Sequence, residues 1–341
     1  MAFHKICIYG VGAIGGWIGA RLASQPGVHL SAVARGETLR ALQTQGLRLQ
    51  SGAPPNEAAP PNEAAQRVAV QASDEPATLG VQDLVILAVK APAMPEVAAR
   101  IAPLIGPDTV VLTAMNGVPW WFLQGFGGPV QSRALASVDP DGTIARAIPA
   151  LHVVGCVVHA SCSVDAPGVI RHHFGDGLIV GEPSGQATPR VQALHALLQK
   201  AGFNATLSPQ IQKDIWFKLW GNMTVNPISA ITGATSDRLL DDDLVRGFMS
   251  SVMREAKAIG ECIGIPIPQE PEDRHAVTRK LGAFKTSMLQ DVQAGKPVEL
   301  DALVSAVREL GQMTGVATPF TDALLGLSRL HARVLGLYPP Q

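Results

Sequence analysis

Apolar residues follow one pattern in the first part of the chain and another in the second. Before residue 207, short continuous apolar runs alternate with polar and glycine-rich segments, which is typical of strands covered on both faces of a sheet. These runs predict strands over residues 6–9, 28–33, 68–70, 83–89, 109–114, 152–159 and 169–181. From Ser208 onward the apolar residues recur with helical spacing. We therefore expect an α/β chain, with a doubly wound sheet domain over 1–207 and an all-α domain over 208–341.

The first predicted strand leads directly into a glycine-rich turn. The segment KICIYGVGAIGGWIGARLA places Gly10, Gly12 and Gly15 after an apolar run. In a dinucleotide-binding fingerprint the first glycine permits the turn, the second lets the backbone approach a pyrophosphate, and the third lets the helix lie close to its strand. The phosphates would bind backbone N–H groups at the helix start, around Ala13 and Ile14. The segment therefore predicts a Rossmann-type domain that binds a dinucleotide.

The end of the second predicted strand bears on which nicotinamide cofactor fits. An acidic residue there would hydrogen-bond a ribose 2′-hydroxyl and repel a 2′-phosphate. The strand ends instead in Ala34, Arg35 and Gly36, and arginine carries a planar, permanent charge suited to a phosphate. We therefore expect NADPH as the cofactor. The alternative is that Arg35 is a solvated surface residue, and Glu37 is the nearby carboxylate that would favour NADH.

Two polar residues follow later strands of the predicted sheet. Lys90 comes at the carboxyl end of the apolar run DLVILAV, and Asn116 follows the next run in Met115-Asn116-Gly117. Ligands of open α/β sheets bind beyond the carboxyl ends of the strands. Lys90 and Asn116 are therefore expected where cofactor and substrate meet. The alternatives are a solvated lysine and an asparagine that only forms a turn.

The second domain is expected to open with a helix that carries an unusual polar stripe. Ser208 and Pro209 suit a helix start, the serine as N-cap. Lys218, Asn222 and Asn226 are spaced by four, which puts them along one stripe of that helix. Apolar residues bound the stripe, namely Trp216, Leu219, Trp220 and Met223. We expect Pro227 to break or kink the helix, or to start a new one with Asn226 as its cap.

A second polar group lies between two later helices. The segment KTSMLQD, which includes Ser287, is expected to close one helix, and Gly295-Lys296-Pro297 to separate it from another. That next helix is expected to begin near Glu299. A carboxylate at such a position is often only a dipole partner or a cap.

Composition narrows the classes of function. The 341 residues carry a formal net charge of −1 and show no basic patch, so nothing indicates nucleic acid or a membrane surface as a partner. Four widely spaced cysteines without a CxxC motif are typical of reduced thiols in a cytoplasmic protein, and we expect no metal site. His159, His172 and His173 have no recognisable carboxylate partner and are expected to be structural. The hexapeptide APPNEA, repeated over 53–64, predicts an exposed insertion.

Taken together, these motifs resemble the ketopantoate reductases. The resemblance rests on GVGAIGG, Lys90, the Asn116–Gly117 turn, WFKLWGNMTVNP, and SMLQD followed by Glu299, in the order that the family has them. It implies an NADPH-dependent reduction of a 2-oxo acid to a 2-hydroxy acid, the step that makes pantoate. It further implies that Lys218 is the general acid and that Glu299 holds the substrate. Asn222, Asn226 and Ser287 fall on substrate-contacting positions, and Lys90 and Asn116 on positions beside the nicotinamide and the substrate.

The residue types suit that chemistry. Hydride delivery to a ketone puts negative charge on oxygen, which an ammonium group stabilises and protonates. Apolar neighbours would lower the pKa of Lys218 towards working pH by desolvation. Where family members often read Glu-x-Asp-x-x-Asn-Gly, this chain has Val304 and Ser305 in the last two positions. That departure leaves another branched 2-oxo acid as an alternative substrate, and a non-catalytic NADP-binding sensor as an alternative function. An apolar face on the C-terminal helices would make a homodimer reasonable.

Overall fold

The structure is a computed structural model that describes residues 2–52 and 66–340. The repeated hexapeptide over 53–64 lies outside the described residues. The chain divides into two compact units, Met1–Met115 with Thr143–Ile211, and Asn116–Gly142 with Gln212–Gln341. Residues 116–142, which the apolar pattern alone counted with the sheet domain, therefore group with the helices. The Glu309 carboxylate ties this segment to the second unit, because it accepts hydrogen bonds of 2.8 Å from the backbone N–H groups of Ala136 and Ser137.

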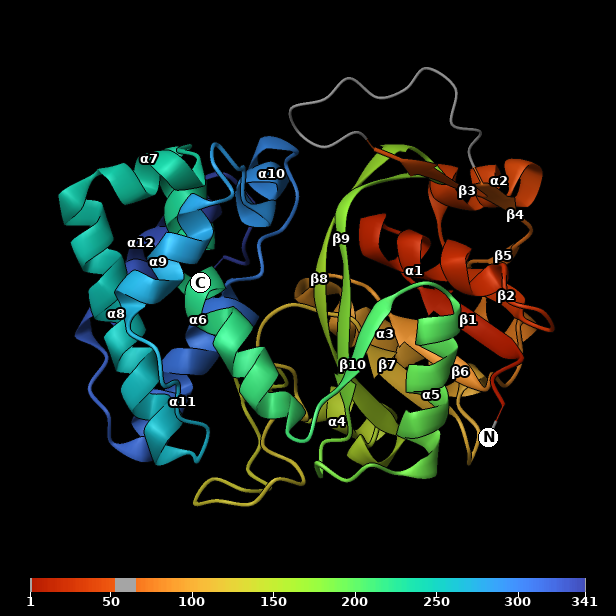
Figure 1. The fold of residues 1–341 in the computed structure, drawn as a ribbon, viewed down its shortest axis with the longest axis horizontal. Helices are drawn as coiled ribbons and strands as arrows, with labels where there is room; N and C mark the ends of the chain where they lie inside the picture. Colours follow the sequence, from red (N-terminus) through yellow and green to blue (C-terminus); the bar gives the residue numbers. More distant parts are fainter. Residues whose placement is uncertain (1, 53–65, 341) are drawn as a thin grey trace. The chain divides into compact units, whose positions relative to one another are not determined.

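Ten strands of the described residues form one sheet in the first unit (Figure 1). They are β1 (Lys5–Tyr9), β2 (His29–Val33), β3 (Leu47–Ser51), β4 (Gln66–Val68), β5 (Gln71–Ser73), β6 (Leu84–Leu87), β7 (Val110–Thr113), β8 (Val153–Ala166), β9 (Val169–Gly181) and β10 (Asn204–Leu207). Strands β1, β6 and β7 are buried along most or all of their length, as their continuous apolar runs indicate. The strand expected over 68–70 is instead two short strands, because β4 ends at Val68 and β5 begins at Gln71.

The order of the strands is that of a Rossmann-type sheet. Strands β5-β2-β1-β6-β7-β8 are neighbours and run parallel throughout. This is the doubly wound order, in which successive strands are added first on one side of β1 and then on the other, from β6 onward. The switch between β1 and β6 leaves a crevice beyond their carboxyl ends. Strand β9 extends the sheet antiparallel to β8, and it also pairs with β3 and β10. The predicted fold class is therefore confirmed.

The helices of the first unit pack on this sheet or continue its loops. They are α1 (Ala13–Ala23), α2 (Gly36–Gln45), α3 (Met94–Arg100), α4 (Thr143–Ala147) and α5 (Pro189–Lys200), with short 3₁₀ turns at Pro76–Thr78, Ala91–Ala93, Ala102–Leu104 and Ala150–His152. Helix α1 packs against β1, β3, β8 and β9, and its Trp17 and Ile18 are fully buried there. Each buried side chain of that size stabilises the fold by about 2 kcal/mol.

The second unit is helical apart from its loops (Figure 1, green to blue). Its elements are α6 (Ile211–Thr232), α7 (Ser236–Asp241), α8 (Asp243–Cys262), α9 (Pro271–Arg279), α10 (Ser287–Gln293), a π-helical turn at Asp301–Ser305, α11 (Ala306–Thr314) and α12 (Pro319–Val334). Helix α8 contacts α7, α9, α11 and α12. Trp220 of α6 is anchored to it, because its indole N–H donates to the Met253 carbonyl at 2.7 Å.

Two expectations about helix α6 are wrong, namely that Ser208 caps its start and that Pro227 breaks it with Asn226 as a cap. The alternative that Pro227 kinks the helix stays a prediction. Helix α6 begins at Ile211, so Ser208 is not its N-cap but accepts from the Gln210 N–H in the preceding turn. The helix also continues through Pro227, and Asn226 is therefore no cap. A proline inside a helix costs about 3 kcal/mol, which burial of neighbours such as Ile228 and Met223, each worth about 2 kcal/mol, offsets.

The segment around Ser287 also differs from its prediction. It opens helix α10 rather than closing a helix. The Thr286 hydroxyl accepts from the Leu289 N–H at 3.1 Å and so caps the start of α10. A threonine hydroxyl can accept from a free N–H group in the first turn of a helix, so Thr286 marks a helix start. The apolar periodicity of residues 285–291 is the same at either end of a helix, and it therefore did not reveal that the segment opens α10.

Candidate active site

The glycine turn has the geometry that its sequence predicts. Gly10 has a φ of +97°, a conformation that side chains rarely adopt. A Cβ at Gly15 would lie 2.2 Å from the Gly10 carbonyl oxygen, so only glycine lets α1 lie this close to β1. At Gly12 a Cβ would meet nothing within 4 Å, so the backbone there faces open space. The first N–H groups of α1, at Ala13 and Ile14, have no carbonyl of their own helix to bind. This arrangement fits a pyrophosphate.

A pocket of about 310 Å³ lies beside this turn. It is lined by the ends of β1 and β2 and by helix α3, including Gly10, Gly12, Arg35, Glu96 and Arg100. The Arg35 guanidinium lies 2.5 Å from the Glu96 carboxylate, and both side chains are largely exposed. The pocket thus holds the predicted arginine, a second arginine and an acid. Its size and charges fit the adenosine half of a dinucleotide that carries a 2′-phosphate.

Lys90 lies elsewhere along the same edge of the sheet. It is exposed and immediately precedes the 3₁₀ turn at Ala91–Ala93, three residues after β6 ends. It is not among the residues that line the 310 Å³ pocket, although the neighbouring Val89 is. Its predicted place beside the nicotinamide stays a prediction.

Lys218 and Asn116 come together within the second unit. The Lys218 ammonium donates a hydrogen bond of 2.8 Å to the Asn116 side-chain carbonyl, although the residues are 102 positions apart. Lys218 is half-buried on α6, between the fully buried indoles of Trp216 and Trp220 along the helix. An amide oxygen accepts from an ammonium without neutralising it. The pair therefore orients a cationic proton donor.

The other polar residues of α6 extend this group. Asn222 is half-buried one turn beyond Lys218, and Asn226 is buried one turn further. The Asn226 amide lies 3.5 Å from the Ser287 hydroxyl at the start of α10, as donor to acceptor. Two of the residues predicted to contact substrate are thus neighbours, although they lie 61 positions apart in the chain.

Glu299 stands at the start of a helix, as predicted. Its carbonyl accepts from the Leu303 N–H at 3.2 Å, and its side chain is only 5% exposed. The π-helical turn Asp301–Ser305 follows directly and continues into α11. Single π-helical turns inside α-helices are found frequently at functional sites.

Several residues of the site were missed by the sequence analysis. Glu96 and Arg100 lie one turn apart on α3, and both line the 310 Å³ pocket. Their i, i+4 spacing was visible in the sequence, but nothing in the chain showed that α3 borders the glycine turn. Asp301 and Tyr338, which form a hydrogen bond of 2.6 Å beside Glu299, were missed for the same reason.

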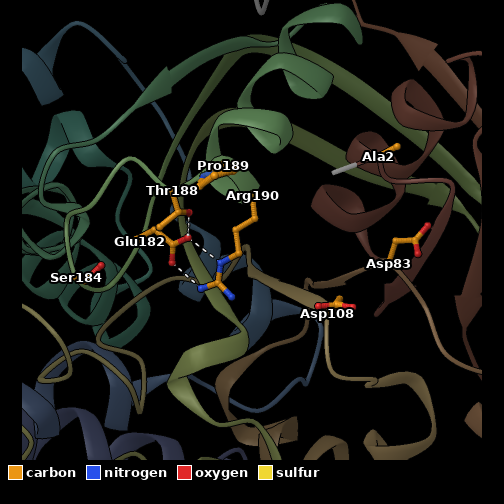
Figure 2. Close-up of a pocket in the computed structure, with 8 residues that line it drawn as sticks. All are labelled: Ala2, Asp83, Asp108, Glu182, Ser184, Thr188, Pro189 and Arg190. Atoms are coloured by element: carbon orange, nitrogen blue, oxygen red, sulfur yellow. Dashed lines mark hydrogen bonds and ion pairs between the residues drawn. The ribbon is translucent and has the colours of Figure 1, made fainter.

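A larger pocket, of about 730 Å³, lies at the opposite edge of the sheet (Figure 2). Asp83 and Asp108 precede β6 and β7, so this is the amino end of the strands, where ligands of such sheets do not bind. Its buried Glu182 accepts from Arg190 Nη2 at 2.6 Å and from the Thr188 hydroxyl at 2.5 Å. Arg190 also donates to the Val153 carbonyl. These groups hold α5 to the sheet, and we assign this pocket a structural role.

The histidines and cysteines of the described part of the chain also have structural surroundings. The His172 ring stacks on Trp17 with centroids 5.3 Å apart, and His173 lies 2.9 Å from the Ser163 hydroxyl. All four cysteines are free. Among residues 2–52 and 66–340, no three metal-ligating side chains gather in one place. Within the same ranges, every helix is too short or too polar to cross a bilayer.

Comparisons with known proteins extend over both units. A family model described as ketopantoate reductase PanE/ApbA matches residues 6–185, and one described as its C-terminal part matches residues 210–332. The chain is 44% identical to a 2-dehydropantoate 2-reductase of Mesorhizobium japonicum, over 98% of this chain and 99% of that relative.

Solved structures give the same result. A candidate ketopantoate reductase from Ralstonia solanacearum MolK2 is 56% identical, with a TM-score of 0.91 over 99% of this chain and 100% of that one. A ketopantoate reductase from Ralstonia eutropha JMP134 is 26% identical, with a TM-score of 0.80 over 97% and 99%. Because the family models and these relatives match nearly the whole chain, the chain belongs to the ketopantoate reductase family.

Proposed function

We propose that the chain reduces 2-dehydropantoate to pantoate with NADPH, and that Lys218 is its proton donor. Family membership supports the reaction. The observation that carries the residue assignment is the 2.8 Å hydrogen bond from the Lys218 ammonium to Asn116, because it orients the charged amine in a group of neutral hydrogen-bonding side chains.

Bound NADPH supplies a hydride to the C2 carbon of the oxo acid. When the C2 carbon takes up the hydride, the electrons of the carbonyl π bond move onto the ketone oxygen. The Lys218 ammonium stabilises the charge on that oxygen and gives it a proton, so that a hydroxyl group forms. Lys218 then regains its proton from solvent. Asn116 keeps the amine directed during the proton transfer, because its side-chain oxygen accepts from the ammonium in the resting state.

The first unit supplies the groups for the cofactor. The N-terminus of α1, at Gly12, Ala13 and Ile14, takes the pyrophosphate through backbone N–H groups. Arg35 takes the 2′-phosphate, and Arg100 in the same pocket adds a second positive charge. Lys90 binds near the nicotinamide, in keeping with its place just after β6.

The second unit supplies the groups for the substrate. Asn222, Asn226 and Ser287 bind the carboxylate and hydroxyl groups of the oxo acid as neutral donors and acceptors. The buried Glu299 carboxylate accepts from the hydroxyl group that distinguishes 2-dehydropantoate from a plain branched oxo acid. A buried carboxylate makes a strong hydrogen bond to a hydroxyl, so it selects for a hydroxylated substrate.

We further propose that the protein is a cytoplasmic homodimer. The free cysteines support a reducing compartment. Leu327, Leu330 and Val334 of α12 form an apolar stripe at i, i+3 and i+7 and are 62%, 62% and 78% exposed. A ketopantoate reductase of Staphylococcus aureus, 19% identical, is described as dimeric. A second copy of the chain would cover the α12 stripe.

Steady-state turnover tests the reaction. We expect oxidation of NADPH in the presence of 2-dehydropantoate, slower oxidation of NADH, and a lower kcat/KM for 3,3-dimethyl-2-oxobutanoate, which lacks the hydroxyl. A higher kcat/KM for another branched oxo acid would identify a different substrate. Binding of NADPH without turnover of any oxo acid would show a sensor instead of an enzyme.

A further inference from the structure

The C-terminal segment reaches back to the turn that follows Glu299. The Tyr338 hydroxyl donates to Asp301 Oδ1 at 2.6 Å, and the Ser305 hydroxyl donates to the same oxygen at 3.0 Å. Burial, together with the hydrogen bond to the Asp301 carboxylate, raises the pKa of Tyr338 to about 12. The tyrosine therefore stays protonated, and remains a donor, throughout the range in which the enzyme works.

A backbone hydrogen bond makes a second connection on the other side of Glu299. The Val298 N–H donates to the Leu337 carbonyl at 3.1 Å. Leu337 and Tyr338 thus hold the chain immediately before Glu299 and two residues after it. Glu299 itself is 5% exposed, so its carboxylate has little room to adopt other rotamers once the backbone is held.

The π-helical turn Asp301–Ser305 is also held by residues 117 and 118. The Ala302 carbonyl accepts from the Val118 N–H at 2.8 Å, and a Cβ at Gly117 would lie 2.7 Å from Ala302. A π-helical turn is less stable than an α-helix and persists where outside contacts favour it. The Asp301 carboxylate, bound by Tyr338 and Ser305, is such a contact.

The two residues that depart from the family pattern take part in this arrangement. Val304 is fully buried, and Ser305 binds Asp301 through its hydroxyl. A serine that binds back to Asp301 favours the turn in a way that a glycine at this position could not, because glycine has no side chain.

We propose that Tyr338 is a positioning residue, which acts through Asp301 and the π-helical turn to direct the Glu299 carboxylate at the hydroxyl group of the substrate. This inference rests on the role proposed for Glu299. It assigns the C-terminal segment a part in substrate selection. A misdirected Glu299 loses its bond to the substrate hydroxyl, but hydride transfer to the ketone and the proton donation by Lys218 do not depend on that bond.

Tyr338→Phe tests the proposal, because it removes one hydroxyl and leaves the ring. We expect kcat/KM for 2-dehydropantoate to fall at least fivefold, with kcat/KM for 3,3-dimethyl-2-oxobutanoate and KM for NADPH within twofold of the parent. An equal fall for both oxo acids, or no fall for either, would overturn it. Ser328→Ala is the matched control, because it removes a buried hydroxyl of α12 that donates to the Leu324 carbonyl. We expect it to leave kcat/KM unchanged for both oxo acids.

Two more variants separate this inference from the proposed function. Asp301→Asn keeps an oxygen that accepts from Tyr338, so we expect it to keep most of the preference for 2-dehydropantoate over 3,3-dimethyl-2-oxobutanoate. Asp301→Leu has no such oxygen and should lose this preference. Adding Tyr338→Phe to Asp301→Leu should cause no further loss, because both changes break the same bond. If Glu299→Gln leaves kcat/KM unchanged for both oxo acids, the role proposed for Glu299 is wrong. If Glu299→Gln removes the discrimination and Tyr338→Phe does not, only the role of Tyr338 fails.

Discussion

The Lys218 ammonium donates a hydrogen bond of 2.8 Å to the side-chain oxygen of Asn116, across 102 residues of chain. Asn116 follows the last residues of β7 but groups with the helices of the second unit. The loop that follows β7 is thus part of the helical unit, and it supplies the acceptor that orients the proposed acid. The consequences can be measured.

Removing the amine should abolish most of the chemical step. Lys218→Met keeps much of the side-chain volume but cannot donate a proton, and general acids contribute about a hundredfold to ten-thousandfold. We expect kcat to fall at least a hundredfold, while binding of NADPH, followed by quenching of tryptophan fluorescence, stays unchanged. Near-normal kcat would remove Lys218 from the proposed role.

Asn116→Asp should change the pH dependence of turnover. A carboxylate at this hydrogen-bonding distance stabilises the ammonium form, so it raises the pKa of Lys218 relative to the parent enzyme. Because the acid must be protonated, activity falls as pH rises through that pKa. The alkaline limb of the kcat profile should therefore move to higher pH in the variant. An unmoved limb would show that Asn116 does not act on the amine.

Arg35 and Glu96 should oppose one another in the choice of cofactor. Losing a charged hydrogen bond to a phosphate costs about 2 kcal/mol, so Arg35→Ala should raise KM for NADPH roughly tenfold or more and hardly change KM for NADH. Glu96→Gln should lower KM for NADPH, because the acid pairs with Arg35 in the pocket. Arg40→Ala, an exposed arginine on α2 outside this pocket, is the control. Parallel changes for both cofactors would contradict the assignment.

The α12 stripe should decide the oligomeric state. Leu327→Glu with Leu330→Glu places two charges on a face that is 62% exposed at both positions, and like charges would oppose a self-complementary interface. Light scattering after size exclusion is expected to show a dimer for the parent and a monomer for the variant. Val277→Glu, on exposed α9, should remain dimeric. A parent chain that is already monomeric would refute the dimer.

His275 should make the helical unit less stable in acid. Burial lowers the pKa of His275, and the charge of Glu272 only partly offsets this. The folded state therefore prefers the neutral ring, which contacts the Ser250 hydroxyl at 2.9 Å. The unfolded chain takes up the proton below about pH 6.5, so stability is lost as pH falls below that value. Between pH 7.5 and pH 5.5, Tm should fall further for the parent than for His275→Gln, and equal falls would contradict this.

Much of the first unit could be predicted from local pattern. The glycine spacing predicted the turn at Gly10, and the continuous apolar runs predicted the parallel strands, because both depend on neighbouring residues. The stripe of Lys218, Asn222 and Asn226 was predicted for the same reason, since helical spacing alone puts them on one face. The first and last residues of the helices were harder to predict from the sequence. Pro227 stays inside α6 because tertiary burial outweighs its local cost.

The sequence by itself determined the two classes of structure, the glycine turn and the residues that could do the chemistry, since these follow from periodicity and side-chain type within short segments. Tertiary structure alone decided the pairings between distant segments, namely Asn116 with Lys218, Glu96 with Arg35, and Tyr338 with Asp301. Each of these pairs depends on how separate helices and loops pack against one another. Packing energy is the sum of many weak contacts across the whole unit, and a local sequence pattern does not contain that information.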